Sequence, residues 1–177
     1  MEFSNTSVDP TALPTLDAAT LQPVSPYYPP YRLLSLPLRW TTLLAVFWLL
    51  LTVSAAPEPL RNLLVPIALV AVLAITLLGY LEAGRRAYGL REHDLIYRSG
   101  LLIRRTAVVP LARIQHVEIA SGPLERRFGL VQLNCFTAGG SSGALGLQGL
   151  DADTAERVRQ YLLSRIRARD AATTSDD

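Results

Sequence analysis

The sequence predicts an α+β protein in which a hairpin of two membrane-spanning helices precedes an antiparallel β-sheet closed by a C-terminal helix. Residues 40–57 and 62–81 carry no charged side chain, which is typical of membrane spans. Between residues 95 and 148, short apolar runs separated by turn residues indicate β-strands. Residues 151–169 then repeat apolar side chains every three or four positions, which indicates one amphipathic helix. Strands followed by a single helix favour the α+β class.

The length of each apolar segment fits a bilayer. At a rise of about 1.5 Å per residue, the two segments extend for roughly 27 and 30 Å, and a hydrocarbon core is about 30 Å thick. Buried helices of a soluble domain would carry a polar stripe, which both segments lack. A cleaved signal peptide would follow a basic n-region, whereas the first apolar segment lies behind a Pro-rich stretch without arginine.

The arginines predict the orientation of the hairpin. Five of them flank the outer ends of the two segments, and the connecting turn holds only Arg61. The flanking residues are Arg32, Arg39, Arg85, Arg86 and Arg91. Because positive residues favour the cytoplasmic side of a membrane, we expect a multi-pass protein of the plasma membrane with both termini in the cytoplasm.

The composition excludes several classes of active site. All 17 basic residues of this 177-residue chain are arginine, so no lysine Schiff base or P-loop lysine exists, and the formal charge is only +2. A single Cys135 excludes an intramolecular disulfide and a cysteine-rich zinc site. The G-x-S-x-G pattern at 139–143 has no downstream histidine, which a nucleophile elbow needs. We therefore predict no enzyme, catalytic residue, cofactor or metal, no nucleic-acid partner and no evident small-molecule substrate.

The chain divides into four parts. The N-terminal part is rich in proline and tyrosine and has no arginine, so we predict a disordered tail that is either a spacer or a ligand for an aromatic groove. In chain order, the parts are a Pro-rich disordered tail (1–31), a transmembrane hairpin (32–83), a soluble domain (84–169) and a polar disordered tail (170–177).

Within the soluble domain we expect five strands and one helix. Ser99-Gly100 predicts a tight turn, and Asp151 is a favourable N-cap for the helix. Cys135 shares a strand face with Val131 and Leu133, so we expect a buried thiol. The predicted strands cover residues 95–98, 101–109, 114–120, 131–137 and 144–148.

Four motifs give the chain a family resemblance. They are the run GLLIRRTAVVP at 100–110, RIQHV at 113–117, GPLERRFGL at 122–130 and TAGG at 137–140. With the two preceding helices, they resemble the YdbS-like family of bacterial membrane proteins, which carry a pleckstrin-homology-like (PH-like) domain. The resemblance covers about residues 30–167. It implies a bent antiparallel sheet of about seven strands closed by a C-terminal helix, and it implies no catalytic residues.

Five arginines are candidate contacts with lipid head groups or with a partner: Arg85, Arg86, Arg113, Arg126 and Arg127. The first two lie at the exit of the second helix, and the last two form one patch if they occupy a helical turn. Structural pairing of Arg113 and Arg126 with Glu118 or Glu125, or with backbone carbonyls, is the alternative. Arg104 and Arg105 are adjacent on a predicted strand, so their side chains point to opposite faces and form no common patch.

Two functions are consistent with these features. One is a non-catalytic scaffolding module at the inner face of the bacterial plasma membrane, which assembles with itself or with a related PH-domain membrane protein. The other is a sensor of acidic phospholipids in the inner leaflet. A PH-like fold does not decide between them, because fold does not imply function.

The predicted orientation can be tested by cysteine labelling. Ser175→Cys should stay unlabelled by a membrane-impermeant maleimide in intact cells, because the arginine asymmetry places the C-terminus in the cytoplasm. Leu60→Cys, in the predicted external turn, should be labelled in the same experiment. Labelling of position 175 in intact cells would contradict the orientation.

Overall fold

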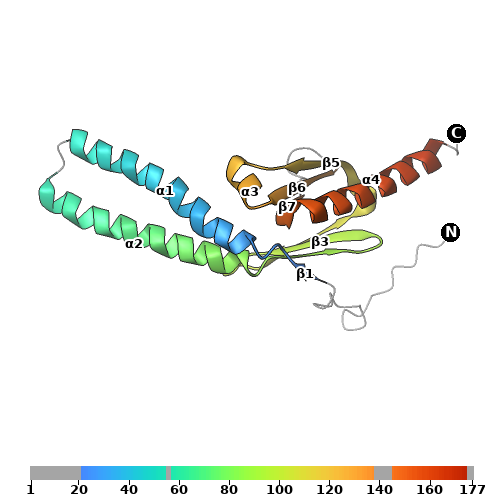
Figure 1. Cartoon of the computed structure of the whole chain (residues 1–177), viewed down its shortest axis with the longest axis horizontal. Helices are drawn as coiled ribbons and strands as arrows, with labels where there is room; N and C mark the ends of the chain where they lie inside the picture. The colour runs from blue at the N-terminus through green and yellow to red at the C-terminus, as the bar shows by residue number, and fades with distance from the viewer. Residues whose placement is uncertain (1–20, 55–56, 138–144, 175–177) are drawn as a thin grey trace, which may run out of the picture.

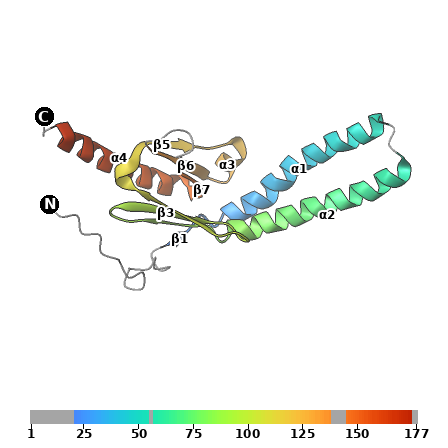
Figure 2. The same cartoon turned by 180° about the vertical axis from the view of Figure 1, so that it is seen from behind.

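The computed structural model describes residues 21–54, 57–137 and 145–174 and consists of a helical hairpin attached to one end of a β-domain (Figures 1 and 2). Helices α1 (Tyr28–Val53) and α2 (Glu58–Ala83) are each 26 residues long. Each has proline in its first turn, where the missing N–H group costs little. Both are long and apolar enough to cross a membrane, and most of their large apolar side chains are exposed.

Residues 21–31 belong to the folded protein, so the prediction of a disordered tail through residue 31 is wrong for this stretch. The short strand β1 (Gln22–Pro23) pairs with β2 (Ala87–Leu90). Val24 and Tyr28 are 7% and 2% exposed and belong to the core. The proline and tyrosine content that suggested polyproline structure instead supplies the first helical turn and buried aromatic area. Residues 1–20 lie outside the described residues.

The β-domain contains two antiparallel sheets and is closed by a long helix, which confirms the predicted α+β class. The first sheet has the order β1-β2-β3-β4 and the second β5-β6-β7. The C-terminal helix α4 packs against the second sheet. The remaining elements are β3 (Asp94–Ser99), β4 (Arg105–Pro110), η3 (Leu111–Arg113), β5 (Ile114–Ala120), α3 (Pro123–Arg127), β6 (Leu130–Thr137), β7 (Leu145–Asp151) and α4 (Ala152–Thr174).

Three local expectations differ from the structure. Strand β2 was not expected, because its four residues alternate too briefly to give a pattern. Ser99 pairs with Arg105, so β3 and β4 are joined by a five-residue loop and not by a tight turn at 99–100. Helix α4 continues to Thr174, beyond the predicted start of the C-terminal tail at residue 170. The last three residues are outside the described part of the chain.

The helical hairpin is inserted between two paired strands. Strand β1 precedes α1, strand β2 follows α2, and Gln22 and Pro23 pair with Tyr88 and Ala87. Both ends of the hairpin are therefore fixed to the same sheet. We call the part of the domain beside these ends the helix-proximal end; the β3–β4 loop and α3 also lie there (Figure 1).

Cys135 lies on the inward face of β6, as its alternation with Val131 and Leu133 predicts. The residue has no exposed surface, and it pairs with Val117 on β5 and Leu145 on β7. Burial disfavours the thiolate and raises the pKa of Cys135 to about 11. The thiol is therefore a core group and not a nucleophile.

Replacement of Cys135 by serine should destabilise the protein. The hydroxyl would be buried without a designed partner, which costs about 1–3 kcal/mol, so the apparent melting temperature of the full chain in detergent should fall. Cys135→Ala is the matched control, because it also removes the sulfur but adds no polar group. A serine variant that melts at or above the alanine variant would contradict this account of the site.

Candidate functional site

A buried polar cluster joins the helical hairpin to the β-domain. Arg86, three residues beyond α2, donates from Nε and Nη2 to the two carboxylate oxygens of Glu82 at 2.7 and 2.9 Å. Its Nη1 donates to Gln148 Oε1 on β7 at 2.7 Å and to the Tyr97 hydroxyl on β3 at 3.2 Å. The guanidinium also lies 5.2 Å from the ring centre of Tyr28. One cation thus contacts residues from α1, α2 and both sheets.

The ion pair in this cluster is largely removed from solvent. The side chains of Arg86 and Glu82 are only 13% and 17% exposed. Burial is the largest single influence and by itself would lower the pKa of Arg86. The hydrogen bonds to Glu82 and the electrostatic contributions of Tyr28, Tyr97 and Glu82 together outweigh it, so the pKa is raised overall. Arginine is seldom buried unless it is paired, and the bidentate geometry supplies that pairing.

Two further contacts extend the cluster. Glu82 Oε1 accepts a hydrogen bond at 3.1 Å from the backbone N–H of Gly100 in the β3–β4 loop. The Tyr28 hydroxyl donates to Gln148 Oε1 at 3.1 Å, and the Tyr28 ring covers Gly149, where a Cβ atom would collide with it. The cluster therefore fixes the start of α1, the end of α2 and the β3–β4 loop relative to one another.

This placement does not fit the expectation that Arg86 contacts lipid head groups. Its hydrogen-bond donors face protein acceptors inside the junction. The neighbouring Arg85 is exposed, although the two residues are adjacent in the sequence. The difference arises because the chain leaves α2 and enters β2 here, so that one side chain points into the junction and the other points out.

Arg85 lines an open basic pocket at the helix-proximal end. The pocket has a volume of about 460 Å³, and its lining residues are Arg85, Arg98, Gly100, Arg104 and Thr106. Arg98 pairs with Thr106 across β3 and β4, so both side chains stand on the same face of the sheet. This is the outer face, because the adjacent Tyr97 points into the core.

The three arginines of this pocket have no acidic partner among the described residues. The ion pairs of the described chain join other residues: Arg61 with Glu58, Arg86 with Glu82, Arg91 with Asp94, Arg159 with Glu156 and Arg165 with Glu92. The nearest acid along α2 is Glu82, and both of its oxygens are occupied by Arg86. Within the described part of the chain, the pocket therefore presents three positive charges that no ion pair offsets.

The loop that borders the pocket exposes two large apolar side chains. Leu102 and Ile103 are 84% and 71% exposed. Gly100 begins the loop with φ of 96°, and a Cβ atom there would collide with the carbonyl oxygen of Ile103. The loop thus folds back tightly, with its apolar residues outward and Gly100 held against Glu82.

The other sequence-predicted arginines lie at two separate places. Arg126 and Arg127 are exposed on the short helix α3, which contacts α1, so they share a helical turn as expected. Arg113 is exposed on η3, which packs against α4 away from the hairpin (Figure 2). Neither Arg113 nor Arg126 forms the expected ion pair with Glu118 or Glu125 in the described structure, and Glu125 instead accepts from the Gly122 N–H at 2.8 Å.

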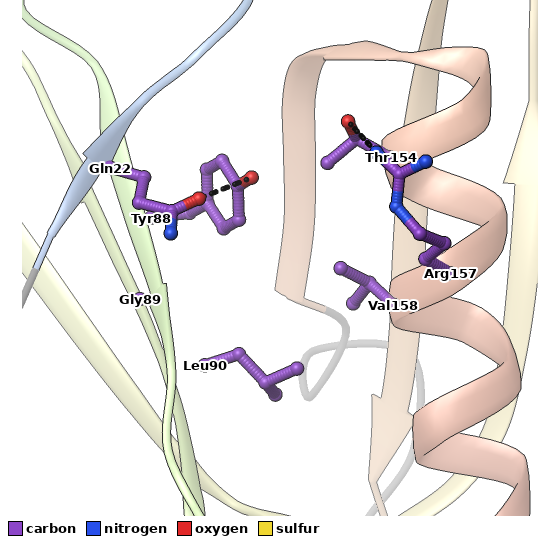
Figure 3. A pocket seen from close by; sticks show the side chains of 7 residues that line it. All are labelled: Gln22, Tyr88, Gly89, Leu90, Thr154, Arg157 and Val158. Carbon is purple, nitrogen blue, oxygen red and sulfur yellow. Dashed lines mark hydrogen bonds between the residues drawn. The ribbon is translucent and has the colours of Figure 1, made fainter.

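A second pocket lies between the first sheet and α4 (Figure 3). Its volume is about 380 Å³, and its lining includes Tyr88 on β2 and Val158 on α4. Its one cationic side chain is Arg157, which donates to Thr154 Oγ1 at 3.1 Å. With a single cation that already has a partner, this pocket is less suited to an anion than the pocket of Arg85, Arg98 and Arg104.

Comparison with known proteins agrees with this architecture. Residues 33–166 match the model of the family described as the bacterial PH domain. The chain belongs to this family. The match covers the helical hairpin together with the β-domain, and it confirms the family resemblance found in the sequence. The bacterial PH domain here is therefore a membrane-associated module.

One curated relative of this bacterial PH domain protein is UPF0699 transmembrane protein YdbS of Bacillus subtilis (strain 168). The two chains are 30% identical over 90 residues, which cover 51% of this chain and 52% of the relative. The chain thus spans about half the length of the curated relative that it matches. No solved structure matches it.

Removal of the carboxylate of Glu82 should be strongly destabilising. Glu82→Gln leaves the buried guanidinium of Arg86 without its counter-charge, and breaking a buried pair in this way costs about 3–5 kcal/mol. The matched control is Glu156→Gln, which breaks the solvent-exposed pair with Arg159 and should change the stability far less, because exposed ion pairs contribute little. Thermal unfolding of the full chain in detergent measures both, and equal losses of stability would contradict a structural role for the buried pair.

Proposed function

We propose that this protein is a non-catalytic, membrane-anchored module whose PH-like domain is held against the anionic inner leaflet of the bacterial plasma membrane. The observation that carries this proposal is the helix-proximal end of the domain. Directly beside the point where α2 ends, it combines the exposed Leu102 and Ile103 with three arginines that have no acidic partner among the residues the structure describes. Cations and exposed apolar side chains at one edge are the features of a surface that contacts a membrane interface.

The orientation of the hairpin supports the inner leaflet as the contacted surface. Arg32 near the start of α1 and Arg85 after α2 lie at the domain end of the hairpin, and Arg39 lies in the half of α1 nearer the domain. The opposite end carries Arg61, whose charge is offset by Glu58 at 3.7 Å. By the preference of arginine for the cytoplasmic side, the domain and both termini are cytoplasmic.

The free energies involved indicate different roles for the helices and for the arginines. Each arginine near an anionic membrane contributes about 1 kcal/mol, and this attraction decays over a Debye length of roughly 8 Å at physiological salt. Three such residues are too few to recruit a protein strongly, but they are enough to hold a tethered domain in one orientation. The helices therefore supply the anchoring, and the helix-proximal end supplies the contact with head groups.

Assembly with another protein is the second candidate, and the edge of the first sheet favours it. Strand β4 ends the order β1-β2-β3-β4, so no described strand pairs with its outer edge. Val108 on this strand is 46% exposed. An unprotected edge of this kind accepts an added strand from a partner, including a second copy of this chain or a related PH-domain membrane protein.

Cysteine protection distinguishes the two candidates. Ile103→Cys should react with a water-soluble maleimide at least ten times more slowly in nanodiscs that contain phosphatidylglycerol than in detergent, because the loop enters the interface. Val108→Cys, placed on the β4 edge, should react equally in both. The full chain is needed, because residues 84–169 alone would lack β1 and Tyr28 of the core.

The buried Cys135 provides no background labelling in this experiment. Equal reaction of Ile103→Cys in detergent and nanodiscs would contradict membrane contact. Protection of Val108→Cys that increases with protein concentration would instead support assembly through the sheet edge.

A further inference from the structure

The charge and shape of the basic pocket point to a particular class of ligand. Arg85, Arg98 and Arg104 come from the α2–β2 connection, from β3 and from the β3–β4 loop. No carboxylate of the described chain pairs with any of them. Three guanidinium groups around one volume of about 460 Å³ repel one another, so an anion that binds between them relieves this repulsion.

The geometry of arginine favours phosphate as the anion. A guanidinium presents a planar fork of N–H donors, which matches two oxygens of one phosphate group. Thr106 adds a hydroxyl to the same pocket, and it stands beside Arg98 across the two strands. The three arginines and Thr106 therefore offer several hydrogen-bond donors to one tetrahedral phosphate group. An apolar ligand would leave these donors without partners.

The number of charges distinguishes between phosphate classes. A phosphodiester has one negative charge and two non-bridging oxygens, which leaves part of this donor set unmatched. A phosphomonoester has three terminal oxygens and a charge of about −1.5 to −2 at neutral pH. Three arginines that form no ion pair within the described residues match the monoester better.

The position of the pocket indicates that the phosphate belongs to a lipid. Arg85 lies two residues beyond the last residue of α2. The loop that carries Arg104 is tied to Glu82 in the last turn of that helix, and Leu102 and Ile103 on the same loop are exposed. The pocket thus lies at the depth where head groups meet the end of a membrane helix, beside apolar side chains that acyl chains can cover.

We propose that Arg85, Arg98 and Arg104 bind the head group of a membrane lipid that ends in a phosphomonoester, of which phosphatidic acid is the simplest example. This inference rests on the proposed function and adds to it a binding site and a class of lipid. It also assigns a role to Arg98 and Arg104, which are not among the contacts predicted from the sequence.

Native mass spectrometry of the full chain in a neutral detergent tests the proposal. We expect phosphatidic acid to bind at least ten times more tightly than phosphatidylglycerol, a diester with the same acyl chains. The double variant Arg98→Gln/Arg104→Gln should lose this preference. The control Arg113→Gln removes an exposed arginine on η3, on the side of the domain away from the hairpin, and should keep the preference unchanged.

A charge-conserving variant separates a built pocket from general attraction. Arg98→Lys/Arg104→Lys retains the charge but loses the guanidinium forks, so the preference for phosphatidic acid should fall several-fold. Full retention of the preference would show that only surface charge matters and would overturn the proposed pocket. All variants should keep the Cys135 thiol unreactive, which reports an intact fold.

Three other results would overturn the inference. They are equal binding of the two lipids by the natural chain, an unchanged preference in the glutamine variant, and displacement of phosphatidic acid by low millimolar inorganic phosphate. The last result would assign the pocket to a soluble phosphate. Failure of these tests is distinct from failure of the proposed function, because membrane contact is measured separately by protection of Ile103→Cys in nanodiscs.

Discussion

The buried ion pair between Arg86 and Glu82 determines how the two parts of this protein are joined. A guanidinium that is 13% exposed requires its hydrogen-bond acceptors, and these acceptors come from α2, β3 and β7. Tyr28 at the start of α1 covers the same cation. The hairpin cannot rotate relative to the domain without breaking this cluster. The position of the basic pocket and of the β3–β4 loop beside the end of α2 depends on it.

Because the helical hairpin is inserted between two paired strands, the segments before α1 and after α2 are both fixed to the β-domain. A domain attached through one helix could pivot about a single backbone segment. Here β1 and β2 pair with each other, and the backbone N–H of Ser25 donates to the carbonyl oxygen of Gly149 at 2.9 Å. Because the segments that enter and leave the hairpin are both held in the domain, the same end of the domain always faces the helices. Under the proposed function, a weak basic surface is then sufficient, since the helices already hold it at the membrane.

The sequence predicted the elements that have a long or regular pattern. The two apolar segments, the strand alternation around Cys135 and the helix after Asp151 are each local features, and they agree with the structure. Strand β1 could not be found in this way, because two residues have no periodicity and their pairing with β2 joins positions more than 60 residues apart. The same limit explains why Arg86 was grouped with Arg85. Only the tertiary structure shows that Gln148 and Tyr97 approach one of these arginines and not the other.

The basic pocket also depends on tertiary structure, and so the sequence pattern alone does not predict it. Arg98 and Arg104 lie six residues apart, and they line one pocket because the loop between β3 and β4 has five residues and returns Arg104 to the end of β3. The expected tight turn would have changed the pairing of Arg98 and placed a different residue beside it. The sequence predicts Arg104 and Arg105 on opposite faces of one strand, but Arg104 lies in the β3–β4 loop and Arg105 begins β4. A pattern of adjacent arginines does not reveal the pocket, because the register between β3 and β4 creates it.

A spin-label distance measurement tests the rigid junction most directly. Labels at Val70→Cys on α2 and Glu92→Cys in the β2–β3 turn would lie on the two sides of the Arg86 cluster, and both positions are exposed. In nanodiscs, double electron–electron resonance should give one narrow distance distribution for the otherwise natural chain. The same pair in a Glu82→Gln background should give a broad one. A broad distribution with Glu82 present, or an equally narrow one without it, would contradict the account.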